Sequence, residues 1–567
     1  MANSQFGYLA PSPASIKRYS WFLLLIAGLG GLLYGIDVGI IAAALLYLSK
    51  TISLTVWQTS IIVAAVLGGG MFSSLVAGVL ADLFGRKTMM LVSGLMFVTS
   101  VGLIVISQGF VPLFLGRLLQ GMSGGVIAVV VPLYLAESLG PNNRGRGTAV
   151  FQFMLTFGIV CAALIGWYYT GQAETAIAHA GGNHELILAA QNHAWRSMFL
   201  VVVYPGLIFF LGAFVLSETP RWLLLRGRAD AALAALRRST PEQEAQRELA
   251  EMQALAQENK TAKSAGTAGS LLRRRYVIPF VIACVIMTLN QTTGINSVLG
   301  FLVIILRQAG MTASHATQGD VVVKVLNCVM TLVAVALVDR KGRRFLLCIG
   351  TAGVVIALAL GGALFIGAES GRTDVRTRIE AAQAGNTVNL PMSALASAAN
   401  GARPMALTVL YSYGAGDHIA TVLSDAPDPV LALAPDAKTP QAPLTIKRAR
   451  YGPVPSENIG WLITACLALF IASYAMGPGV VVWLAMSELL PTRIRSIGMG
   501  ISLLLNQGAA TLIAAVFLPV VGNFGYAAMF FAWAGCTVLY FLTAAFFLPE
   551  TKGKTLEEIE MHFAGGR

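Results

Sequence analysis

Long apolar stretches separated by short polar gaps run through the whole chain. Twelve of these stretches contain about 20 apolar residues or more, which is enough to cross a bilayer as a helix. They lie at 21–47, 58–81, 88–107, 112–138, 146–169, 197–217, 277–306, 320–338, 345–367, 457–487, 495–520 and 526–548. The pattern predicts an all-α membrane protein with twelve transmembrane helices in two pseudo-symmetric six-helix halves.

Polar segments divide the chain into five parts. The linker between the halves is charged and rich in helix-forming residues, so we expect amphipathic helices there. The parts are an N-terminus (1–20), a first half (21–217), the linker (218–276), a second half (277–548) and a C-terminus (549–567).

Composition agrees with a membrane protein. Charged residues make up only 12% of the 567, against roughly 25% in soluble domains. The net charge of +12 comes from Lys and Arg concentrated in the short loops on one side of the apolar stretches. This positive-inside bias indicates a multi-pass protein of the cell membrane with both termini in the cytoplasm, rather than binding to nucleic acid.

Catalytic and metal chemistry have no support in the sequence. The six cysteines all lie inside apolar stretches and form no CxxC pair, so neither a disulfide framework nor a zinc site is expected. No nucleophile–base or metal-ligand constellation stands out, so we expect no enzyme activity and no cofactor.

A charged motif occurs once in each half. Asp82 and Arg86 flank Gly85 in one gap, and Asp339 and Arg343 flank Gly342 in another. A second acid–base pair also occurs once in each half. Glu137 and Arg144 are seven residues apart (144 − 137), as are Glu488 and Arg495 (495 − 488). Two membrane halves with the same polar hinges indicate a transporter that arose by internal duplication.

The offsets between the repeats reveal an insertion. The first motifs are 257 residues apart (339 − 82) and the second pairs 351 (488 − 137), so the second half has gained about 94 residues (351 − 257). Only 368–456 can hold them, on the non-cytoplasmic side. This segment is rich in Ala, Pro, Asp and Gly and lacks helical periodicity, which favours a surface loop. A partly disordered lid or an interaction segment is the alternative.

Seven short motifs resemble one known family. The run GVLADLFGRK (78–87) resembles the loop signature of the major facilitator superfamily. Six others resemble the sugar porter family within it: GRLLQG (116–121), PLYLAE (132–137), ETPRW (218–222), NQTTGIN (290–296), DRKGRR (339–344) and PETKGK (549–554). The resemblance, to bacterial sugar–proton symporters and animal glucose facilitators, covers nearly all the chain except 368–456 and the first fifteen residues. It implies the major facilitator fold.

Asp37 is the sharpest single candidate residue. A carboxylate in the middle of a membrane helix costs about 2.5–3.5 kcal/mol on insertion scales, and such groups are usually paired and functional. The resemblance implies Arg117 as its partner, and implies proton coupling, because proton-coupled relatives carry Asp here and facilitators carry Asn. A structural salt bridge without coupling is the alternative.

Amides inside apolar helices form the candidate sugar site. Carboxamides both donate and accept hydrogen bonds, which suits the hydroxyls of a neutral sugar, and a tryptophan ring can stack on a pyranose. The candidates are Gln152, Asn290, Gln291, Asn296, Asn327, Asn506 and Trp483. Each lone amide could instead satisfy a hydrogen bond between helices. The sequences at 292–294 and 477–479 predict breaks in two of these helices.

Several departures from the family pattern leave the sugar open. Asn290 replaces the first Gln of the usual Gln-Gln pair, Gly300 and Phe301 replace two tyrosines, and Gln507 replaces a tryptophan. We expect a roomier or differently shaped outer pocket.

Charges at the cytoplasmic helix ends are the candidate gating network. Single exposed pairs contribute about 0–1 kcal/mol, but a network can bias a two-state equilibrium. We expect the pairs to form only when the halves close there; topological anchoring is the alternative. The network is Asp82, Arg86, Glu137, Arg144, Glu218, Arg221, Asp339, Arg343, Glu488, Arg495 and Glu550.

Lys324 is a further charge in an apolar stretch. Asp320 lies four residues before it, so we expect an intrahelical pair that snorkels toward the outer surface. The alternative is a second charge in the cavity.

Together these features predict a proton-coupled secondary transporter that imports a monosaccharide by alternating access. Its partners would be a small neutral sugar, a proton and the lipid bilayer, and it would work as a monomer. The alternatives are a proton-independent sugar or polyol facilitator, a disaccharide porter, and a non-transporting sugar sensor. The short segment after Lys554 counts against a sensor.

Overall fold

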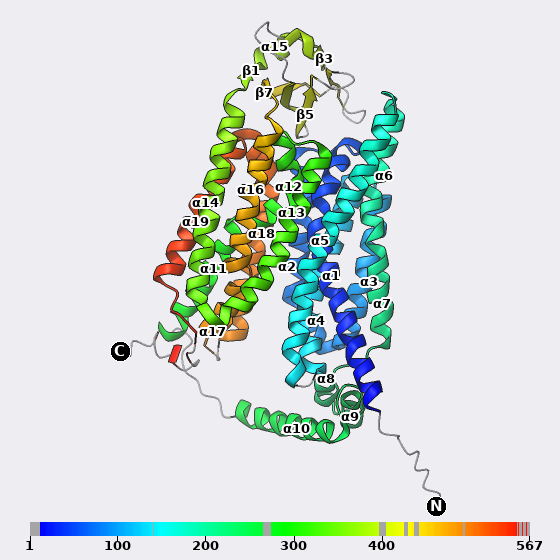
Figure 1. Ribbon diagram of the computed structural model, residues 1–567. Coiled ribbons are helices and arrows are strands. Elements are labelled where there is room, and N and C mark those ends of the chain that lie inside the picture. Colours follow the sequence, from blue (N-terminus) through cyan, green and yellow to red (C-terminus); the bar gives the residue numbers. More distant parts are fainter. Residues whose placement is uncertain are drawn as a thin grey trace, which may run out of the picture.

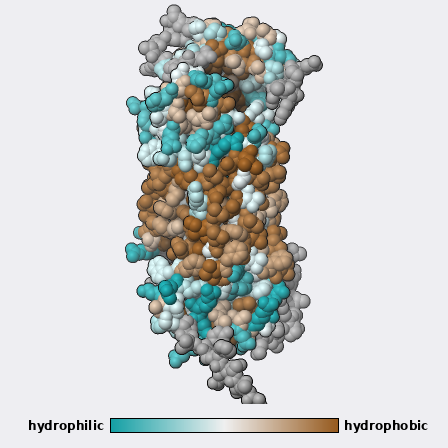
Figure 2. Space-filling view, turned by 90° about the vertical axis from the view of Figure 1, so that its right-hand side faces the viewer, coloured by the Kyte–Doolittle hydropathy of each residue, from teal (hydrophilic) through white to brown (hydrophobic). Residues whose placement is uncertain are grey.

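The computed structural model describes most of the chain. The described residues are 12–139, 141–264, 274–395, 404–414, 416–424, 429–435, 442–491, 494–552, 554, 558, 559 and 563. Twelve helices among them are long and apolar enough to cross a membrane, which confirms the predicted class and span count. A broad hydrophobic belt surrounds the middle of the molecule, between two hydrophilic ends (Figure 2).

The first half contains the first six spans. The sixth consists of two helices that meet at Val202. The helices are α1 (Pro13–Thr51), α2 (Val56–Phe84), α3 (Arg86–Ile106), α4 (Phe110–Ser138), α5 (Pro141–His179), α6 (His184–Val201) and α7 (Val203–Val215). The end of α5 and the start of α6 extend beyond the apolar stretches that predicted them, because helix-favouring polar residues continue each helix.

Three short helices of the linker lie at one end of the bundle (Figure 1). They are α8 (Pro220–Leu225), α9 (Ala229–Arg237) and α10 (Glu242–Ser264). We call this the linker end, and the opposite end the β-domain end.

The second half contains the other six spans, and both predicted breaks are present. Span seven changes direction at Gly294, which has the left-handed backbone conformation (φ 82°). Span ten contains a π-helical turn, η2 (Ala475–Gly479), around Pro478. The helices are α11 (Arg274–Thr292), α12 (Ile295–Gln308), α13 (Ala313–Lys341), α14 (Arg343–Ser370), α16 (Glu457–Tyr474), α17 (Val481–Leu489), α18 (Arg495–Phe524) and α19 (Tyr526–Phe546).

Glycines let helices of the first half approach closely. A methyl group on Gly35 of α1 would clash with the carbonyl oxygen of Leu155 on α5. Gly121 of α4 faces the carbonyl of Val66 on α2 in the same way. Small residues allow such backbone contact in membrane helix pairs. Between the halves, α1 packs on α12, α2 on α18 and α5 on α13.

The segment between α14 and α16 is a folded β domain, so the expectation of a surface loop is wrong. Two antiparallel sheets, in the orders β1-β7-β4-β5 and β2-β3-β6, enclose a core that includes Leu407, Leu431 and Ile446. Its elements are β1 (Thr373–Asp374), α15 (Arg376–Ala381), β2 (Gln383–Ala384), β3 (Thr387–Pro391), η1 (Met392–Leu395), β4 (Met405–Ser412), β5 (Asp417–Leu423), β6 (Val430–Leu433) and β7 (Thr445–Pro453). The domain covers the end of the bundle opposite the linker helices (Figure 1).

Candidate functional site

Asp37 and Arg117 form a buried ion pair inside the first half. Arg117 Nη1 lies 3.2 Å from Asp37 Oδ1, and each side chain is 1% exposed. The pair joins α1 to α4. The predicted partners therefore do meet.

Two neighbours of this pair were not singled out from the sequence. The Arg117 Nη1 also donates to Gln120 Oε1 at 2.8 Å, and its guanidinium lies 5.6 Å from the Phe199 ring centroid. Gln120 follows Arg117 by three residues, so helical spacing could have suggested it. Phe199 belongs to α6, and no local pattern points to it.

The pair leaves one carboxylate oxygen without a bond. Asp37 Oδ2 is buried and has no hydrogen-bond partner among the described residues. It faces Gly124 of α4, where a methyl group would lie 3.5 Å from it. An unbonded buried oxygen is an atom at which this carboxylate can accept a proton.

Three of the candidate amides form a hydrogen-bonded chain beside the break in span seven. Asn296 Nδ2 donates to Gln291 Oε1 at 2.7 Å, and Gln291 Nε2 donates to Asn506 Oδ1 at 3.1 Å. Asn506 Nδ2 donates to the Met287 carbonyl oxygen at 2.8 Å. The chain crosses from α12 through α11 to α18, so that it spans the break at Gly294 between α11 and α12.

Gln152 and Asn327 lie where the two halves touch. Thr156 Oγ1 of α5 lies 3.5 Å from Cys328 Sγ of α13. Gln152 is one turn before Thr156, and Asn327 directly precedes Cys328. Both amides are half-buried, and neither side chain makes a hydrogen bond with a described residue, so their polar groups are open to another partner.

The structure does not join Asn290 or Trp483 to these amides. The Asn290 side chain is buried and accepts a hydrogen bond from the Tyr540 hydroxyl of α19 at 3.4 Å. Trp483, on α17, is 38% exposed. Among the described residues, no ring contact or hydrogen bond links it to the chain.

A compact charge cluster closes the linker end of the first half. Arg86 bridges Asp82 at 2.8 Å and Glu137 at 2.9 Å. The same oxygen of Glu137, Oε2, accepts from Thr219 Oγ1 at 2.7 Å, and Oε1 accepts from Arg86 Nη2 at 3.0 Å. The residues of this cluster come from α2, α3, α4 and the start of the linker, so it fastens elements of one half together.

Glu218 has a different role, as a cap of α3. Its carboxylate accepts the backbone N–H groups of Arg86 at 2.9 Å and Lys87 at 3.1 Å. Gly85, with φ 98°, lets the chain turn so that these groups face the acid. Burial raises the pKa of the Glu218 carboxyl, and the backbone N–H bonds oppose the rise.

The second half repeats both arrangements. Arg343 Nη2 lies 3.1 Å from Glu488 Oε1, and Thr551 Oγ1 donates to Glu488 Oε2 at 2.6 Å. Glu550 accepts the backbone N–H groups of Arg343 at 2.9 Å and Arg344 at 3.0 Å. The sequence offered a signal for the two threonines, since Glu-Thr follows the last span of each half.

These contacts correct two parts of the predicted network. The pairs form inside each half in the part of the chain that the structure describes, so they do not require closure of the halves. Arg221 is exposed and makes no ion pair with a described residue, because the cap and the bridge use its neighbours instead. The side chains of Arg144, Asp339 and Arg495 lie outside the described residues.

Lys324 is paired as expected, but it does not snorkel. Its Nζ lies 2.7 Å from Asp320 Oδ2, and both side chains are almost wholly buried. The same nitrogen donates to the carbonyl oxygen of Gly39 at 3.0 Å. Helix α13 begins at Ala313, before the apolar stretch, so Asp320 and Lys324 lie well inside it and face α1 of the other half.

Comparisons with known proteins agree on one family. The family described as "Sugar (and other) transporter" matches residues 23–387 and 444–563, which leaves out the middle of the β domain. The glucose transporter GlcP of Staphylococcus epidermidis is 26% identical over 552 residues, 96% of this chain and 97% of its own. The galactose-proton symporter of Escherichia coli is 26% identical over 555 residues, 98% and 96% of the two chains.

The fold matches solved transporter structures. An inward-open structure of the xylose transporter XylE from E. coli aligns with a TM-score of 0.67 at 21% identity, over 96% of this chain and 99% of that one. The relatives and the fold are those of multi-pass membrane transporters rather than enzymes. The chain therefore belongs to the sugar (and other) transporter family, as its repeated charge motifs and sugar porter signatures indicated.

Proposed function

We propose that this protein imports a monosaccharide together with a proton by alternating access. The observation that carries the proposal is the Asp37–Arg117 ion pair, buried in α1 and α4 with one carboxylate oxygen unbonded. Carboxylates at such depth in membrane proteins are usually functional. The symporters among its relatives support coupling to protons.

Protonation of Asp37 would change the forces on Arg117. The ionised carboxylate attracts the guanidinium strongly in a medium of low dielectric, and the neutral acid does not. Arg117 then keeps only Gln120 and the face of Phe199 as partners. A proton on Asp37 Oδ2 would thus release the contact that joins α1 to α4, which is a local change able to bias two conformations.

The polar groups near the break in span seven support a neutral sugar as substrate. The chain of Asn296, Gln291 and Asn506 offers donors and acceptors in fixed positions. Gln152 and Asn327 offer two more amides, whose side chains have no hydrogen-bond partner among the described residues. Substrate sites in transporters often lie beside interrupted helices. Trp483 would join the site only after the halves move.

The two charge clusters would stiffen the moving halves at the cytoplasmic end rather than bridge them. Each fastens the helix ends of one half, so that the half moves as a rigid body. The halves are in contact near the β-domain end, where Ser60 Oγ accepts the Leu518 backbone N–H at 3.2 Å. In the proposed cycle this is the inward-facing arrangement, with both termini in the cytoplasm, the β domain outside and a single chain as the working unit.

Uptake by proteoliposomes tests the proposal. Under an imposed proton gradient we expect accumulation of a monosaccharide, abolished by an uncoupler. A competition screen over monosaccharides, polyols and disaccharides would identify the substrate class. The rival is a facilitator, supported by relatives such as the Xenopus laevis facilitated glucose transporter member 12, 27% identical over 552 residues. Equal uptake with and without the uncoupler would favour that rival.

A further inference from the structure

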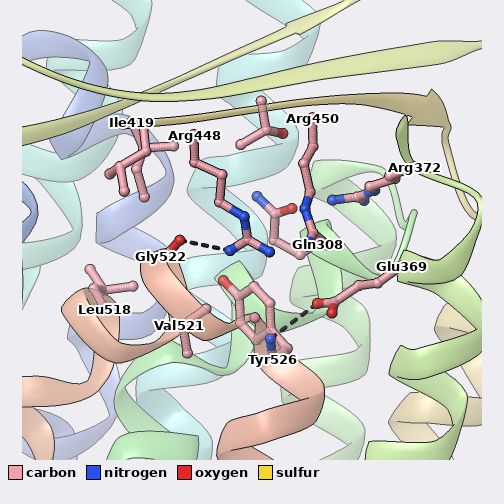
Figure 3. A pocket seen from close by; sticks show the side chains of 13 residues that line it. Gln308, Glu369, Arg372, Ile419, Arg448, Arg450, Leu518, Val521, Gly522 and Tyr526 are labelled. Atoms are coloured by element: carbon pink, nitrogen blue, oxygen red, sulfur yellow. Dashed lines mark hydrogen bonds between the residues drawn. The ribbon is translucent and has the colours of Figure 1, made fainter. Parts of the chain in front are cut away.

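Two arginines of the β domain point toward the membrane helices. Arg448 and Arg450 are two residues apart on β7, so they lie on the same face of the strand. Ala449 between them is buried in the core of the domain. Leu410 and Thr408 of β4 pair with Arg448 and Arg450, so they lie on the same face of the sheet. Figure 3 shows both side chains extending from the strand toward the ends of the helices.

This face covers a cavity above the ends of the helices. The cavity is open to solvent, and its empty volume, counted together with that open space, is about 630 Å³. The end of α18 and the start of α19 form its floor, and Glu369 and Arg372 enter from the end of α14 (Figure 3). The β domain and the second half therefore meet around a hollow, beside the contact of Ile419 and Leu410 with Gly522 of α18.

The charges in this cavity do not balance. Among the lining residues, the three guanidinium groups of Arg372, Arg448 and Arg450 face one carboxylate, that of Glu369. A second carboxylate, that of Asp374, belongs to the residue opposite Arg450 on β1 but does not line the cavity. Glu369 is already engaged, because its Oε1 accepts the backbone N–H of Tyr526 at 3.0 Å. The lining residues thus carry an excess of two positive charges.

Only one of the arginines has a partner for its side chain. Arg448 Nη1 donates to the carbonyl oxygen of Gly522 at 2.8 Å. Arg450 and Arg372 make no side-chain hydrogen bond or ion pair with a described residue, and Arg372 Nε is buried without a partner. These side chains are only partly buried, but a buried nitrogen without a partner, such as Arg372 Nε, is costly.

The positive charges of the lining residues favour a bound anion in the cavity. Burial lowers the pKa of the Arg372 and Arg448 guanidinium groups, Glu369 raises both, and the nearby Arg450 lowers both. The three cations therefore repel one another in a partly dehydrated space. A bound anion would relieve this repulsion and use the free N–H donors.

We propose that the cavity binds an oxyanion, a phosphate or carboxylate group, which fastens the β domain to the second half. Planar guanidinium forks match the oxygen geometry of both groups and bind them through paired hydrogen bonds. The anion belongs either to a free solute or to the headgroup of an acidic lipid. The site stands on its own contacts and does not depend on the transport cycle.

Thermal unfolding of the full chain tests the site. The protein in detergent is titrated with inorganic phosphate, and separately with glucuronate, against sodium chloride of equal ionic strength. Saturable stabilisation is expected, because a ligand that binds only the folded state raises the unfolding temperature. Arg450→Gln should weaken the apparent affinity about tenfold or more, the equivalent of one charge-assisted hydrogen bond.

Arg376→Gln is the matched control. Arg376 lies in the same domain, is exposed, and pairs with Glu380 at 2.6 Å outside the cavity. Its loss removes the same charge and should leave the titration unchanged. Arg372→Gln is a second test variant in case Arg450→Gln is poorly folded in chloride alone.

Nanodiscs separate the two sources of the anion. Stabilisation by phosphatidylglycerol over phosphatidylcholine, lost in Arg450→Gln, would identify a lipid headgroup, whereas stabilisation by phosphate or glucuronate in detergent would identify a solute. The proposal is overturned if none of these anions stabilises the protein beyond chloride. Equal stabilisation of wild type and both cavity variants would overturn it as well.

Discussion

Replacing Asp37 with asparagine separates binding from proton coupling. The asparagine keeps an oxygen near Arg117 Nη1 but cannot titrate, so it imitates the protonated acid permanently. Arg117 would retain its bond to Gln120 and its contact with Phe199. We expect the carrier still to bind sugar and exchange it across the membrane, because exchange needs no net proton movement.

Two free energies set the expected size of the effect, one for stability and one for accumulation. Removing one partner of a buried ion pair costs about 3–5 kcal/mol of folding free energy, and the retained oxygen and neighbours place Asp37→Asn near the low end. One charge crossing a membrane potential of 100 mV is worth about 2.3 kcal/mol. At about 1.4 kcal/mol per tenfold, this drives roughly 50-fold accumulation in the wild type and none in the variant.

Two assays in proteoliposomes, with a matched control, decide the matter. Counterflow exchange should persist in Asp37→Asn, while accumulation under a proton gradient should disappear. Asp320→Asn is the control, because Asp320 is equally buried and paired with Lys324 at 2.7 Å, yet lies in the other half. It should keep accumulation. If Asp37→Asn accumulates sugar as well as wild type, Asp37 is not the coupling residue. If accumulation is lost only in Asp320→Asn, the coupling residue belongs to the Asp320–Lys324 pair instead.

Three other predictions concern the sugar site, the charge cluster and the β domain. Gln152→Ala should weaken sugar binding by about 1–3 kcal/mol in a binding titration, with little change in stability. Gln291→Ala should weaken binding and also lower the unfolding temperature, because Asn296 and Asn506 both lose a hydrogen-bond partner. Unchanged affinity in both variants would place the sugar elsewhere. Arg86→Ala leaves the buried carboxylate of Glu137 without its ion-pair partner and should destabilise the first half by about 3–5 kcal/mol. It should also raise the labelling of a cysteine probe placed between the two halves at the linker end. Unchanged labelling would indicate a purely structural cluster. Replacing 373–453 with a short Gly/Ser linker removes the β domain from β1 to β7, whose pairing brings the two ends of the deletion close together, and it preserves Glu369. Uptake should stay largely intact, and loss of uptake despite normal insertion would make the domain part of the transport machinery.

The spans and their breaks could be predicted because their causes are local. A bilayer requires a fixed length of apolar helix, so counting apolar residues finds each span. Gly294 and Pro478 break helices through their own backbone properties, whatever surrounds them. Asp37 could be singled out because a charge inside a membrane helix needs a partner, and the family resemblance implied Arg117 as that partner.

The β domain was missed because its signal has a different period. A search for helical spacing finds nothing in 445–453, yet buried Ile446, Ala449 and Tyr451 alternate with polar residues in most of that strand. Abundant Ala, Pro and Gly between the strands hid this alternation of period two. The cavity was out of reach for another reason, since its arginines and its carboxylate meet only after the strands fold onto the helices.

One capping device occurs at three places and changes how the charge clusters should be tested. Each time, a glycine with φ between 92° and 98° precedes a helix, and a distant glutamate accepts the first backbone N–H groups of that helix. The pairs are Gly85 with Glu218, Gly342 with Glu550, and Gly525 with Glu369. The third lies at the β-domain end, away from the other two, so the device itself is a way of fixing helix starts and carries no sign of gating. Glu218 and Glu550 should accordingly be intact in every state of the cycle, and variants there would report stability. Variants meant to report gating belong instead at Glu137 and Glu488, whose carboxylates bind guanidinium groups rather than backbone.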